Sequence, residues 1–187
     1  MDKNSAPQFS CDYYRMSGRT WEKENVFRRC LRLLNSHALR YLLAYRKVRQ
    51  GSDPLKICSF CLKRIQRKYG IALESSQIGK GLYLGHPYNI TVGRYAEIGE
   101  NCNLNKGAAI VPRKNSDEKA APKLGNRVWV GVNAVVTGDI TIGDNVLIAP
   151  NAYVDFDVPS DSIVIGNPAK IIPDRTDATE GYIHHVC

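Results

Sequence analysis

Aliphatic residues recur at every sixth position through most of the chain beyond residue 70, and a glycine often follows them. A period of six is neither helical nor that of simple strand alternation. It fits short strands and turns that coil around a common axis, so that three units form one coil of a triangular prism. We therefore predict a parallel β-helix over residues 70–172, with these side chains pointing inward: Ile78, Leu84, Val92, Ile98, Leu104, Ile110, Leu124, Val130, Val136, Ile142, Ile148 and Val154.

The six-residue register slips at two places. The step from Leu84 to Val92 is two residues too long, around His86-Pro87-Tyr88-Asn89, and a longer insertion lies at about residues 111–121. Repeat proteins often carry their insertions on the face that binds a ligand. His86 is the only histidine of the predicted β-helix, and its position at a break in the repeat favours a functional role over a packing role.

Residues 1–69 show helical spacing instead. Apolar residues fall three and four positions apart between Trp21 and about Arg49, which predicts one amphipathic helix. Asp53 and Pro54 have the residue types of an N-cap and a first helical position, so a second helix is expected to follow them. Its Cys58-x-x-Cys61 pair has no partner pair, and we expect buried structural thiols rather than a metal or redox site.

The composition of the 187 residues, 43% hydrophobic and 24% charged, is that of a globular protein. The chain has no run of the roughly 18–20 apolar residues that a membrane span needs, and its polar N-terminus has no apolar signal core. We therefore expect a cytoplasmic protein whose six cysteines are reduced thiols. The tail, residues 173–187, is polar beyond Pro173, and we expect it to be disordered.

Charge is divided unevenly along the chain. Residues 1–70 carry 16 Lys and Arg against 5 Asp and Glu, whereas residues 71–187 carry 10 against 13. A basic surface favours an anionic partner, and peripheral contact with an anionic membrane at its inner face is one hypothesis. A solvated helix surface is the alternative. Nucleic acid is not expected, because no groove-reading motif accompanies the charge.

Several motifs taken together resemble the hexapeptide-repeat acyltransferases. The likeness covers about residues 69–172 and is greatest to the serine acetyltransferase branch, which includes relatives in capsule and exopolysaccharide gene clusters. It implies a left-handed β-helix, a homotrimer with active sites at subunit interfaces, acetyl-CoA as co-substrate and no metal. The N-terminal helices could then pair two trimers. The motifs are Tyr69-Gly70-Ile71, Ile78-Gly79-Lys80-Gly81, Leu84-Gly85-His86-Pro87 and Gly166-Asn167-Pro168-Ala169-Lys170.

The resemblance places the family's catalytic histidine on His86, with the role of general base toward an acceptor hydroxyl. Asn103, Asn105 and Asn133 are unranked candidates to stabilise the oxyanion of the tetrahedral intermediate. Cys102 is the only local rival as a nucleophile, and its position in a regular repeat favours packing.

The same resemblance implies where the donor binds. Pantetheine is expected along Gly131, Asn133 and Ala134, and the phosphate end of CoA near Lys170. Arg175 is a weaker candidate for a phosphate contact. Whether Trp129 lines this groove or packs between coils is left open.

The acceptor side departs from the serine acetyltransferase pattern. Gly85 stands where the family has an Asp directly before the catalytic histidine, and Ala120 and Ala121 replace an Arg-His pair. Those residues hold the charged groups of the amino acid in the family. The acid that orients the histidine aligns with Ile71, for which Glu74 or a backbone carbonyl is the candidate substitute.

The sequence therefore predicts an acetyl-CoA-dependent O-acetyltransferase that acts on a sugar hydroxyl of a surface polysaccharide or its precursor. Asn105, Arg113 and Lys114 are the candidate acceptor contacts, and solvated loop charge is the alternative for the last two. Serine O-acetylation in cysteine biosynthesis is the alternative reaction, and a non-catalytic β-helix scaffold or binding module is the alternative of another class. A metal-dependent hydratase on this fold would need several histidines around its metal, whereas the predicted prism has only His86.

Overall fold

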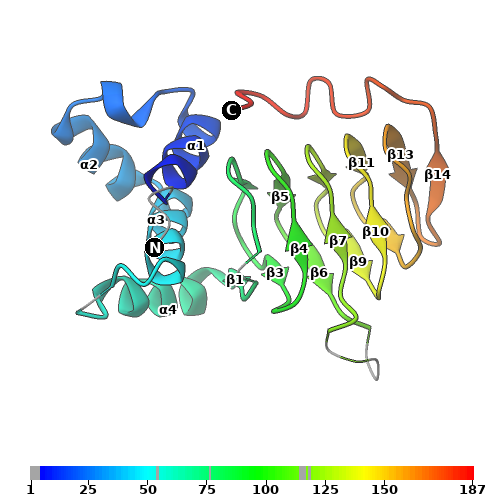
Figure 1. Ribbon diagram of the computed structural model, residues 1–187, viewed down its shortest axis with the longest axis horizontal. Helices are drawn as coiled ribbons and strands as arrows, with labels where there is room; N and C mark the ends of the chain where they lie inside the picture. Colours follow the sequence, from blue (N-terminus) through cyan, green and yellow to red (C-terminus); the bar gives the residue numbers. More distant parts are fainter. Residues whose placement is uncertain (1–4, 54, 76, 114–116, 118) are drawn as a thin grey trace.

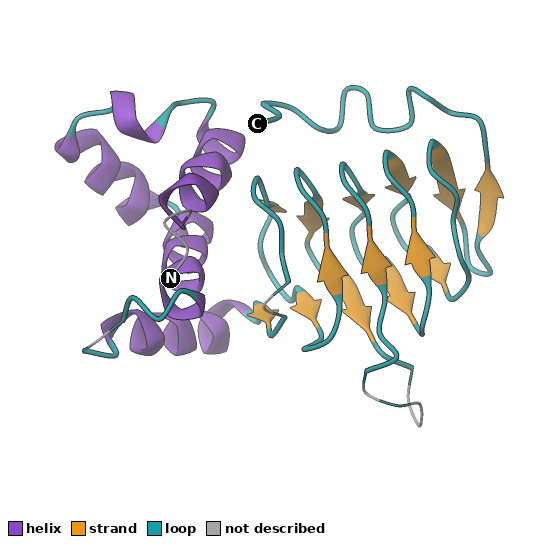
Figure 2. Cartoon of the chain, in the orientation of Figure 1, coloured by secondary structure: helices purple, strands orange, loops and turns teal. Residues whose placement is uncertain are grey.

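The computed structural model describes residues 5–53, 55–75, 77–113, 117 and 119–187. Helices occupy the N-terminal part of the chain, and a stack of short strands follows (Figure 2). The helices are α1 (Ser5–Ser17), α2 (Val26–Asn35), α3 (His37–Arg49) and α4 (Ile57–Tyr69), with a 3-10 turn η1 at Trp21–Lys23. No helix in the described part of the chain is long and apolar enough to cross a membrane.

The prediction of one helix between Trp21 and Arg49 is wrong, because the chain divides at Ser36. The Ser36 hydroxyl accepts a hydrogen bond from the Leu39 N–H (3.2 Å) and so caps α3. The apolar face also divides. The α3 half is buried in the core, whereas the α2 half is exposed, with Phe27 75% accessible to solvent. No prediction covered α1.

Helix α4 begins three residues later than expected, at Ile57. Asp53 still acts as a cap, since its carboxylate accepts from the N–H groups of Cys58 (2.9 Å) and Ser59 (2.7 Å). The expectation that both cysteines of this helix are buried is wrong: Cys58 is half-buried and Cys61 is exposed. Pro54 lies outside the described residues.

The strands form three sheets that wrap around one axis (Figure 1). All pairs are parallel except the last, β13 with β14. The five-stranded sheet contains β1 (Ala72–Leu73), β3 (Thr91–Val92), β6 (Ala109–Val111), β9 (Val135–Thr137) and β12 (Tyr153–Val154). The three-stranded sheet contains β4 (Glu97–Ile98), β7 (Lys123–Leu124) and β10 (Thr141–Ile142). The six-stranded sheet contains β2 (Tyr83–Gly85), β5 (Asn103–Asn105), β8 (Trp129–Val130), β11 (Val146–Ile148), β13 (Ser162–Ile165) and β14 (Lys170–Ile172).

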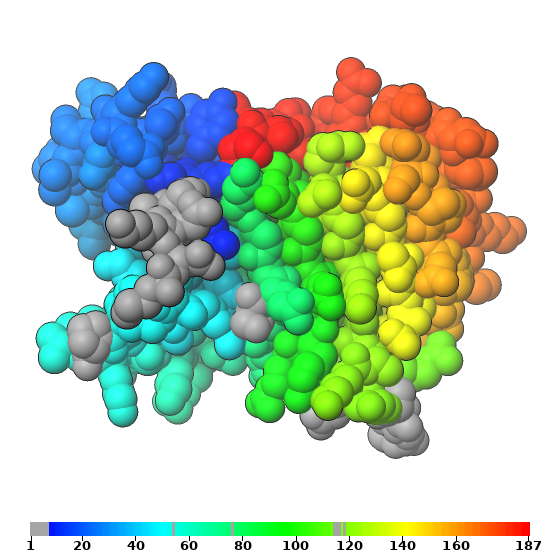
Figure 3. Space-filling view, in the orientation of Figure 1, coloured from blue at the N-terminus to red at the C-terminus, as the bar shows by residue number. Residues whose placement is uncertain are grey.

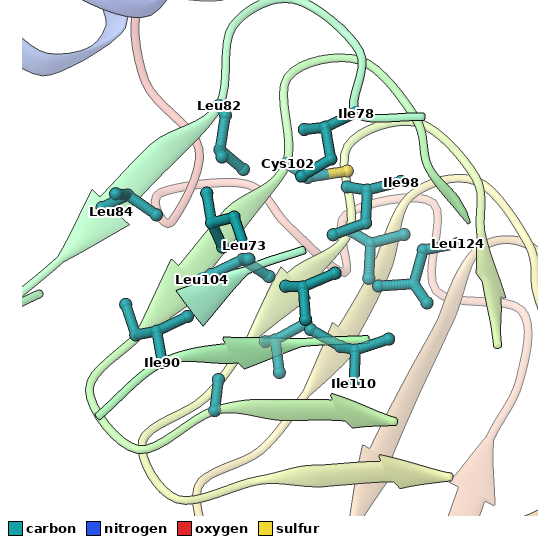
Figure 4. Packing of buried hydrophobic residues seen from close by; sticks show 14 of the residues in the cluster. Leu73, Ile78, Leu82, Leu84, Ile90, Ile98, Cys102, Leu104, Ile110 and Leu124 are labelled. Carbon is teal, nitrogen blue, oxygen red and sulfur yellow. The ribbon is translucent and has the colours of Figure 1, made fainter. Parts of the chain in front are cut away.

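The aliphatic residues of the six-residue repeat form the core of this prism. All twelve predicted positions are buried, none more than 4% exposed. They stack coil upon coil, as in the pairs Val130 with Ile148 and Val136 with Val154, each eighteen residues apart. Figure 4 shows part of this ladder, with Cys102 among the aliphatic side chains. The fold is a left-handed parallel β-helix, as predicted.

A buried ion pair joins the helices to the first coil. Arg46 of α3 donates two hydrogen bonds to the carboxylate of Asp12 in α1, at 2.8 and 3.1 Å. Arg46 also donates to the carbonyl oxygens of Ile78 and Gly79 (both 2.6 Å), and Asp12 accepts from the N–H of Leu82 (2.9 Å). Both charged groups are almost fully buried, so their hydrogen bonds fix the position of the helices on the prism.

The C-terminal residues are ordered, contrary to expectation. After β14 they turn back along the prism and end beside α1 (Figure 1), and the red end of the chain fills the space between the blue helix and the green coils in Figure 3. We call residues 175–187 the strap. Its last residue, Cys187, forms a disulfide with Cys11 of α1. The expectation that all six cysteines are free thiols is therefore wrong for this pair, which the sequence separates by 176 residues.

Two edges of the prism border the six-stranded sheet. The His86 edge contains the turns at residues 86–89, 106–107, 131–133 and 149–151, where the chain passes on to the five-stranded sheet, and the turn at 166–168, which joins β13 to β14. The strap edge, where the chain arrives from the three-stranded sheet, contains the turns at residues 79–81, 99–101, 125–127, 143–145 and 160–161. The outer face of the six-stranded sheet lies between these two edges.

Candidate active site

His86 lies in the turn that follows β2, with a left-handed backbone (φ 47°) and an exposed side chain. The N–H of Tyr88 donates to the His86 carbonyl (2.8 Å), which closes the turn. From the helical side, His37 places its Nε2 3.2 Å from the carbonyl oxygen of Pro87 and stacks on Tyr69 with ring centroids 4.0 Å apart. His37 thus supports the backbone of the turn, and the His86 imidazole itself is exposed to solvent.

A pocket of about 450 Å³ lies on the outer face of the six-stranded sheet, between the strap and the His86 turn. None of the described residues that line it carries a side-chain carboxylate. A larger hollow of about 610 Å³ lies between α1 and α2 and contains none of the sequence-predicted site residues, so volume alone does not select the site. The lining of the smaller pocket is Arg15, Met16, Ser17, Gly18, Tyr83, Gly85, His86, Asn103, Asn105, Trp129, Gly181, Tyr182, His184 and His185.

Arg15 of α1 is a site residue that the sequence reasoning missed. It is 2% exposed, and burial lowers the pKa of its guanidinium. The guanidinium donates to the carbonyl oxygens of Gly81 (3.1 Å), Asn101 (3.3 Å) and His184 and to Oδ1 of Asn103. Its hydrogen bonds are thus already used to join α1, two coils and the strap. The predicted helices began at Trp21, so no signal pointed to this residue.

Asn105 explains why residue 85 is glycine. The Asn105 side chain donates from Nδ2 to the Val130 carbonyl (2.7 Å), and its Oδ1 lies 2.1 Å from the place where a Cβ on residue 85 would stand. A side chain at position 85 therefore cannot coexist with this rotamer of Asn105. The neighbouring coil supplies a carboxamide beside His86, at a position where the family pattern has an Asp directly before the histidine.

The three oxyanion candidates differ in their surroundings. Asn103 donates from Nδ2 to the Tyr182 carbonyl (3.1 Å), and Asn105 is likewise engaged with Val130, so both amides are held in place inside the pocket. Asn133 is exposed on the His86 edge and contacts Asn151 on the next coil, with 3.5 Å between Nδ2 and Oδ1. The structure brings Asn103 and Asn105 into the His86 pocket and places Asn133 along the edge.

The donor candidates follow the His86 edge. Backbone hydrogen bonds of 2.9 Å stack its turns, from Gly107 N–H to Tyr88 O and from Asn133 N–H to Lys106 O. At the far end Lys170 is exposed and pairs in register with Ile165, the last residue of β13. Side chains of Asn133 and Lys170 therefore face solvent at two points along one edge.

Gly131 and Ala134 have a different place. Both are buried, and a Cβ on residue 131 would stand 2.5 Å from the backbone nitrogen of Pro150. These two residues allow close packing of successive coils, so any contact with a donor would come from their backbone.

Arg113 and Glu74 lie away from the pocket of this chain. Arg113 forms an ion pair with Asp155 (2.5 Å) at the third edge of the prism, between the five- and three-stranded sheets, and Lys114 lies outside the described residues. Glu74 follows β1 at that same third edge, so it does not orient His86 within the chain. Trp129, by contrast, lines the His86 pocket and contacts Tyr182 at a ring-centroid distance of 5.0 Å.

Cys102 is fully buried, and burial raises the pKa of its thiol to about 12. A thiol with such a pKa is protonated near neutral pH and is a poor nucleophile. The structure thus supports the packing role expected for Cys102. Within the described residues, no group of three His, Cys, Asp or Glu side chains is placed to hold a metal ion.

Known proteins share this repeat and this fold. The family description "Bacterial transferase hexapeptide (six repeats)" matches residues 121–155. Serine acetyltransferase 2 of Arabidopsis thaliana is 31% identical over 169 residues, which cover 83% of this chain and 51% of the relative. The serine acetyltransferase of Helicobacter pylori is 38% identical over 97 residues, which cover 52% of this chain and 57% of the relative. The chain thus spans about half the length of the curated relatives it matches.

Among solved structures, soybean serine acetyltransferase complexed with serine matches with a TM-score of 0.70 at 25% identity. The match covers 91% of this chain and 70% of that chain. The resemblance predicted from the motifs is confirmed for the family, whereas the capsule and exopolysaccharide branch stays a prediction. The chain therefore carries the repeat of the bacterial hexapeptide transferases, and the relatives to which it is similar are serine acetyltransferases.

Proposed function

We propose that the chain is an acetyl-CoA-dependent O-acetyltransferase with His86 as its general base. The observation that carries this proposal is the placement of His86, exposed at the rim of a pocket and on the same prism edge as Asn133 and Lys170. An imidazole in that position can exchange a proton with a hydroxyl bound in the pocket. The names of the relatives support acetyl transfer.

In the proposed reaction, the neutral imidazole of His86 takes the proton of the acceptor hydroxyl as that oxygen attacks the thioester carbonyl carbon. The carbon–sulfur bond then breaks, and the departing CoA thiolate receives the proton from the imidazolium. The products are an acetyl ester and CoA, and His86 returns to its neutral form. The pocket amides of Asn103 and Asn105 are the candidates to stabilise the oxyanion. This direct transfer requires no nucleophilic cysteine.

For the donor, we propose that acetyl-CoA lies along the His86 edge. The residues present fit such a ligand, because Asn133 offers an exposed amide and Lys170 an exposed ammonium at the end of the edge. The ammonium suits a phosphate, and the amide suits the polar groups of pantetheine. Gly131 and Ala134 would contribute only backbone groups.

L-Serine is the acceptor that the relatives' names support, because the proteins from Arabidopsis thaliana, Helicobacter pylori and soybean are all named serine acetyltransferase. The sugar acceptor that the sequence favoured has no support from these relatives. One observation keeps it as a second candidate: the described lining of the His86 pocket has no side-chain carboxylate to pair with an ammonium, and it includes the rings of Tyr83, Trp129 and Tyr182. Aromatic faces suit the apolar face of a sugar ring.

We also propose that the chain assembles. The resemblance implies a homotrimer, and α2, α4 and the residue just before the first turn of α4 expose apolar side chains that could pair two trimers. These side chains are Val26, Phe27, Leu34, Leu55, Ile57 and Phe60, each between 59% and 77% exposed. Light scattering of the purified protein gives the mass; a monomer at micromolar concentration would contradict the proposal.

The cytoplasmic location and the contact of the basic helices with an anionic membrane stay predictions. Flotation with anionic and neutral vesicles tests the membrane contact. Equal recovery with the two kinds of vesicle would remove it.

The activity is tested by CoA formation from acetyl-CoA, with L-serine and a panel of free and nucleotide-linked sugars as acceptors. CoA formation with serine supports the reaction of the relatives, and CoA formation with a sugar but not serine supports the second candidate. No CoA formation with any acceptor, together with no binding of acetyl-CoA, would contradict the enzyme proposal and favour a non-catalytic scaffold.

A further inference from the structure

We propose that the strap is the acceptor-side wall of the His86 pocket and that the Cys11–Cys187 disulfide holds this wall in place. The inference rests on the proposed acetyl transfer, since it assigns the strap to the acceptor rather than to the donor. The strap lies toward the strap edge of the six-stranded sheet, whereas the proposed donor residues follow the His86 edge. The pocket lies between them.

The first half of the strap is anchored to prism turns whose residues do not line the pocket. The N–H of Arg175 donates to the Asp161 carbonyl (2.7 Å). Asn145 donates from Nδ2 to the Thr176 carbonyl (3.0 Å) and accepts at Oδ1 from the Thr179 hydroxyl (2.6 Å). Thr179 is only 5% exposed. These hydrogen bonds use groups of the prism turns to bind the strap, so the strap is a fixed part of the fold.

The second half of the strap reaches the pocket itself. Tyr182 places its ring against Trp129, and its carbonyl accepts from Nδ2 of Asn103. The buried guanidinium of Arg15 donates to the carbonyl of His184. Three groups that line the pocket therefore hold the strap by its backbone and by one ring. Removal of the strap would leave Asn103 and Arg15 without these partners and would open the pocket on this side.

The end of the strap is fastened twice. Asn101 and Cys187 exchange two hydrogen bonds, from Asn101 Nδ2 to the Cys187 carbonyl (3.0 Å) and from the Cys187 N–H to Asn101 Oδ1 (3.1 Å). The disulfide to Cys11 adds a covalent link to α1, the helix that also supplies Arg15. A cross-link at Cys187 restricts the segment between this residue and the hydrogen bonds that anchor the strap to the prism. Loss of this link should therefore loosen Tyr182 and the wall that it forms.

The first test compares one strap variant with two controls in steady-state kinetics, with L-serine or the sugar that the acceptor panel identifies. Tyr182→Ala is expected to raise the acceptor KM roughly 3- to 10-fold, the change that corresponds to the binding free energy of one aromatic contact. The acetyl-CoA KM should stay unchanged. Tyr182→Phe keeps the ring and should behave as the wild type. Glu180→Ala, an exposed strap residue outside the pocket, is the control for the strap.

The second test breaks the covalent link. Cys187→Ser is expected to raise the acceptor KM in the same way, and Cys30→Ser, which removes an exposed free cysteine, should have no effect. Dithiothreitol should reproduce the effect in the wild type without any substitution. It passes two electrons and two protons to the cystine, so that two thiols form while the reagent closes its own disulfide. It should not change the Cys187→Ser variant.

An unchanged acceptor KM in Tyr182→Ala and Cys187→Ser, or an equal rise in both substrate KM values, would overturn the strap inference and leave the proposed function intact. A wild-type protein that binds no acetyl-CoA and forms no CoA with any acceptor would overturn the proposed function and the inference with it. CoA is quantified by chromatography, because dithiothreitol interferes with thiol-reactive dyes.

Discussion

The His86 edge and the strap edge have the same backbone turn but different surroundings. Asn133 and Asn151 on the first edge have φ of 56° and 60°, and Asn101 and Asn145 on the second have 57° and 55°. Asparagine tolerates this left-handed conformation better than most residues. The first pair is exposed, whereas the second is 5% and 7% exposed, because the strap covers it. The same asparagine turn is therefore open to a ligand on one edge and holds the strap on the other.

The largest loss of stability is expected where α1 and α3 meet the first turn of the strap edge. Asp12→Ala leaves Arg46 charged, buried and without its carboxylate, which should cost about 3–5 kcal/mol in the free energy of unfolding. Urea unfolding followed by circular dichroism measures this. The matched control is Asp139→Ala, which removes an exposed carboxylate. A loss at Asp12 no greater than at Asp139 would contradict the anchoring role of the pair.

The next largest loss of stability is expected at the asparagines of the strap edge and not at those of the His86 edge. Asn101→Ala or Asn145→Ala removes side-chain hydrogen bonds to the strap and should cost about 1–3 kcal/mol each in the free energy of unfolding. Asn133→Ala should cost less than either, since its side chain is exposed and makes one long contact. Equal losses at the three positions would show that the turn, rather than the strap, sets the role of these residues.

A smaller effect is expected at the His86 turn. Gly85→Ala must displace Oδ1 of Asn105 and with it the hydrogen bond to Val130, at a cost of about 1 kcal/mol. The double variant Gly85→Ala with Asn105→Ala removes the clash. It should be more stable than the sum of the two single changes implies. Additive losses in thermal unfolding would contradict the packing of Asn105 into the space beside residue 85.

The smallest perturbation is chemical labelling of the native protein. Iodoacetamide at pH 8 should modify the exposed Cys30 and Cys61 and leave Cys102 unmodified, because burial raises the pKa of that thiol to about 12. The deprotonated fraction of Cys102 grows only as the pH approaches that value. Peptide mass mapping reads out each site. Fast modification of Cys102 in the folded state would contradict its place in the core.

The interior of the prism was predictable from the sequence because one requirement repeats there. Every coil must point an aliphatic side chain inward at the same step, as Val130, Ile142 and Ile148 do, and the six-residue period records that requirement. The register slip at His86 was readable for the same reason. A periodic pattern shows its own interruptions, and the interruption lies at the pocket.

The strap and α1 were not predictable because their partners are distant in the sequence. Tyr182 packs on Trp129, and Arg15 contacts Asn103 and His184, with no periodic signal to connect them. The polar composition of the tail favoured disorder. The hydrogen bonds that anchor the tail to the prism could not be predicted from its own sequence, because their other partners lie in the prism turns. Arg113 and Glu74 show the same limit, since both lie at the third edge of the prism, away from His86. A linear pattern does not say which prism edge a residue occupies.

The most direct test of the central claim is the rate of acceptor-dependent CoA formation by the wild type and by His86→Ala at equal protein concentration. We predict a loss of about 10²- to 10⁴-fold in turnover, the range for removal of a general base, with unfolding midpoints that agree because the side chain is exposed. Near-normal turnover by His86→Ala would contradict the assignment of the His86 edge as the site of acetyl transfer.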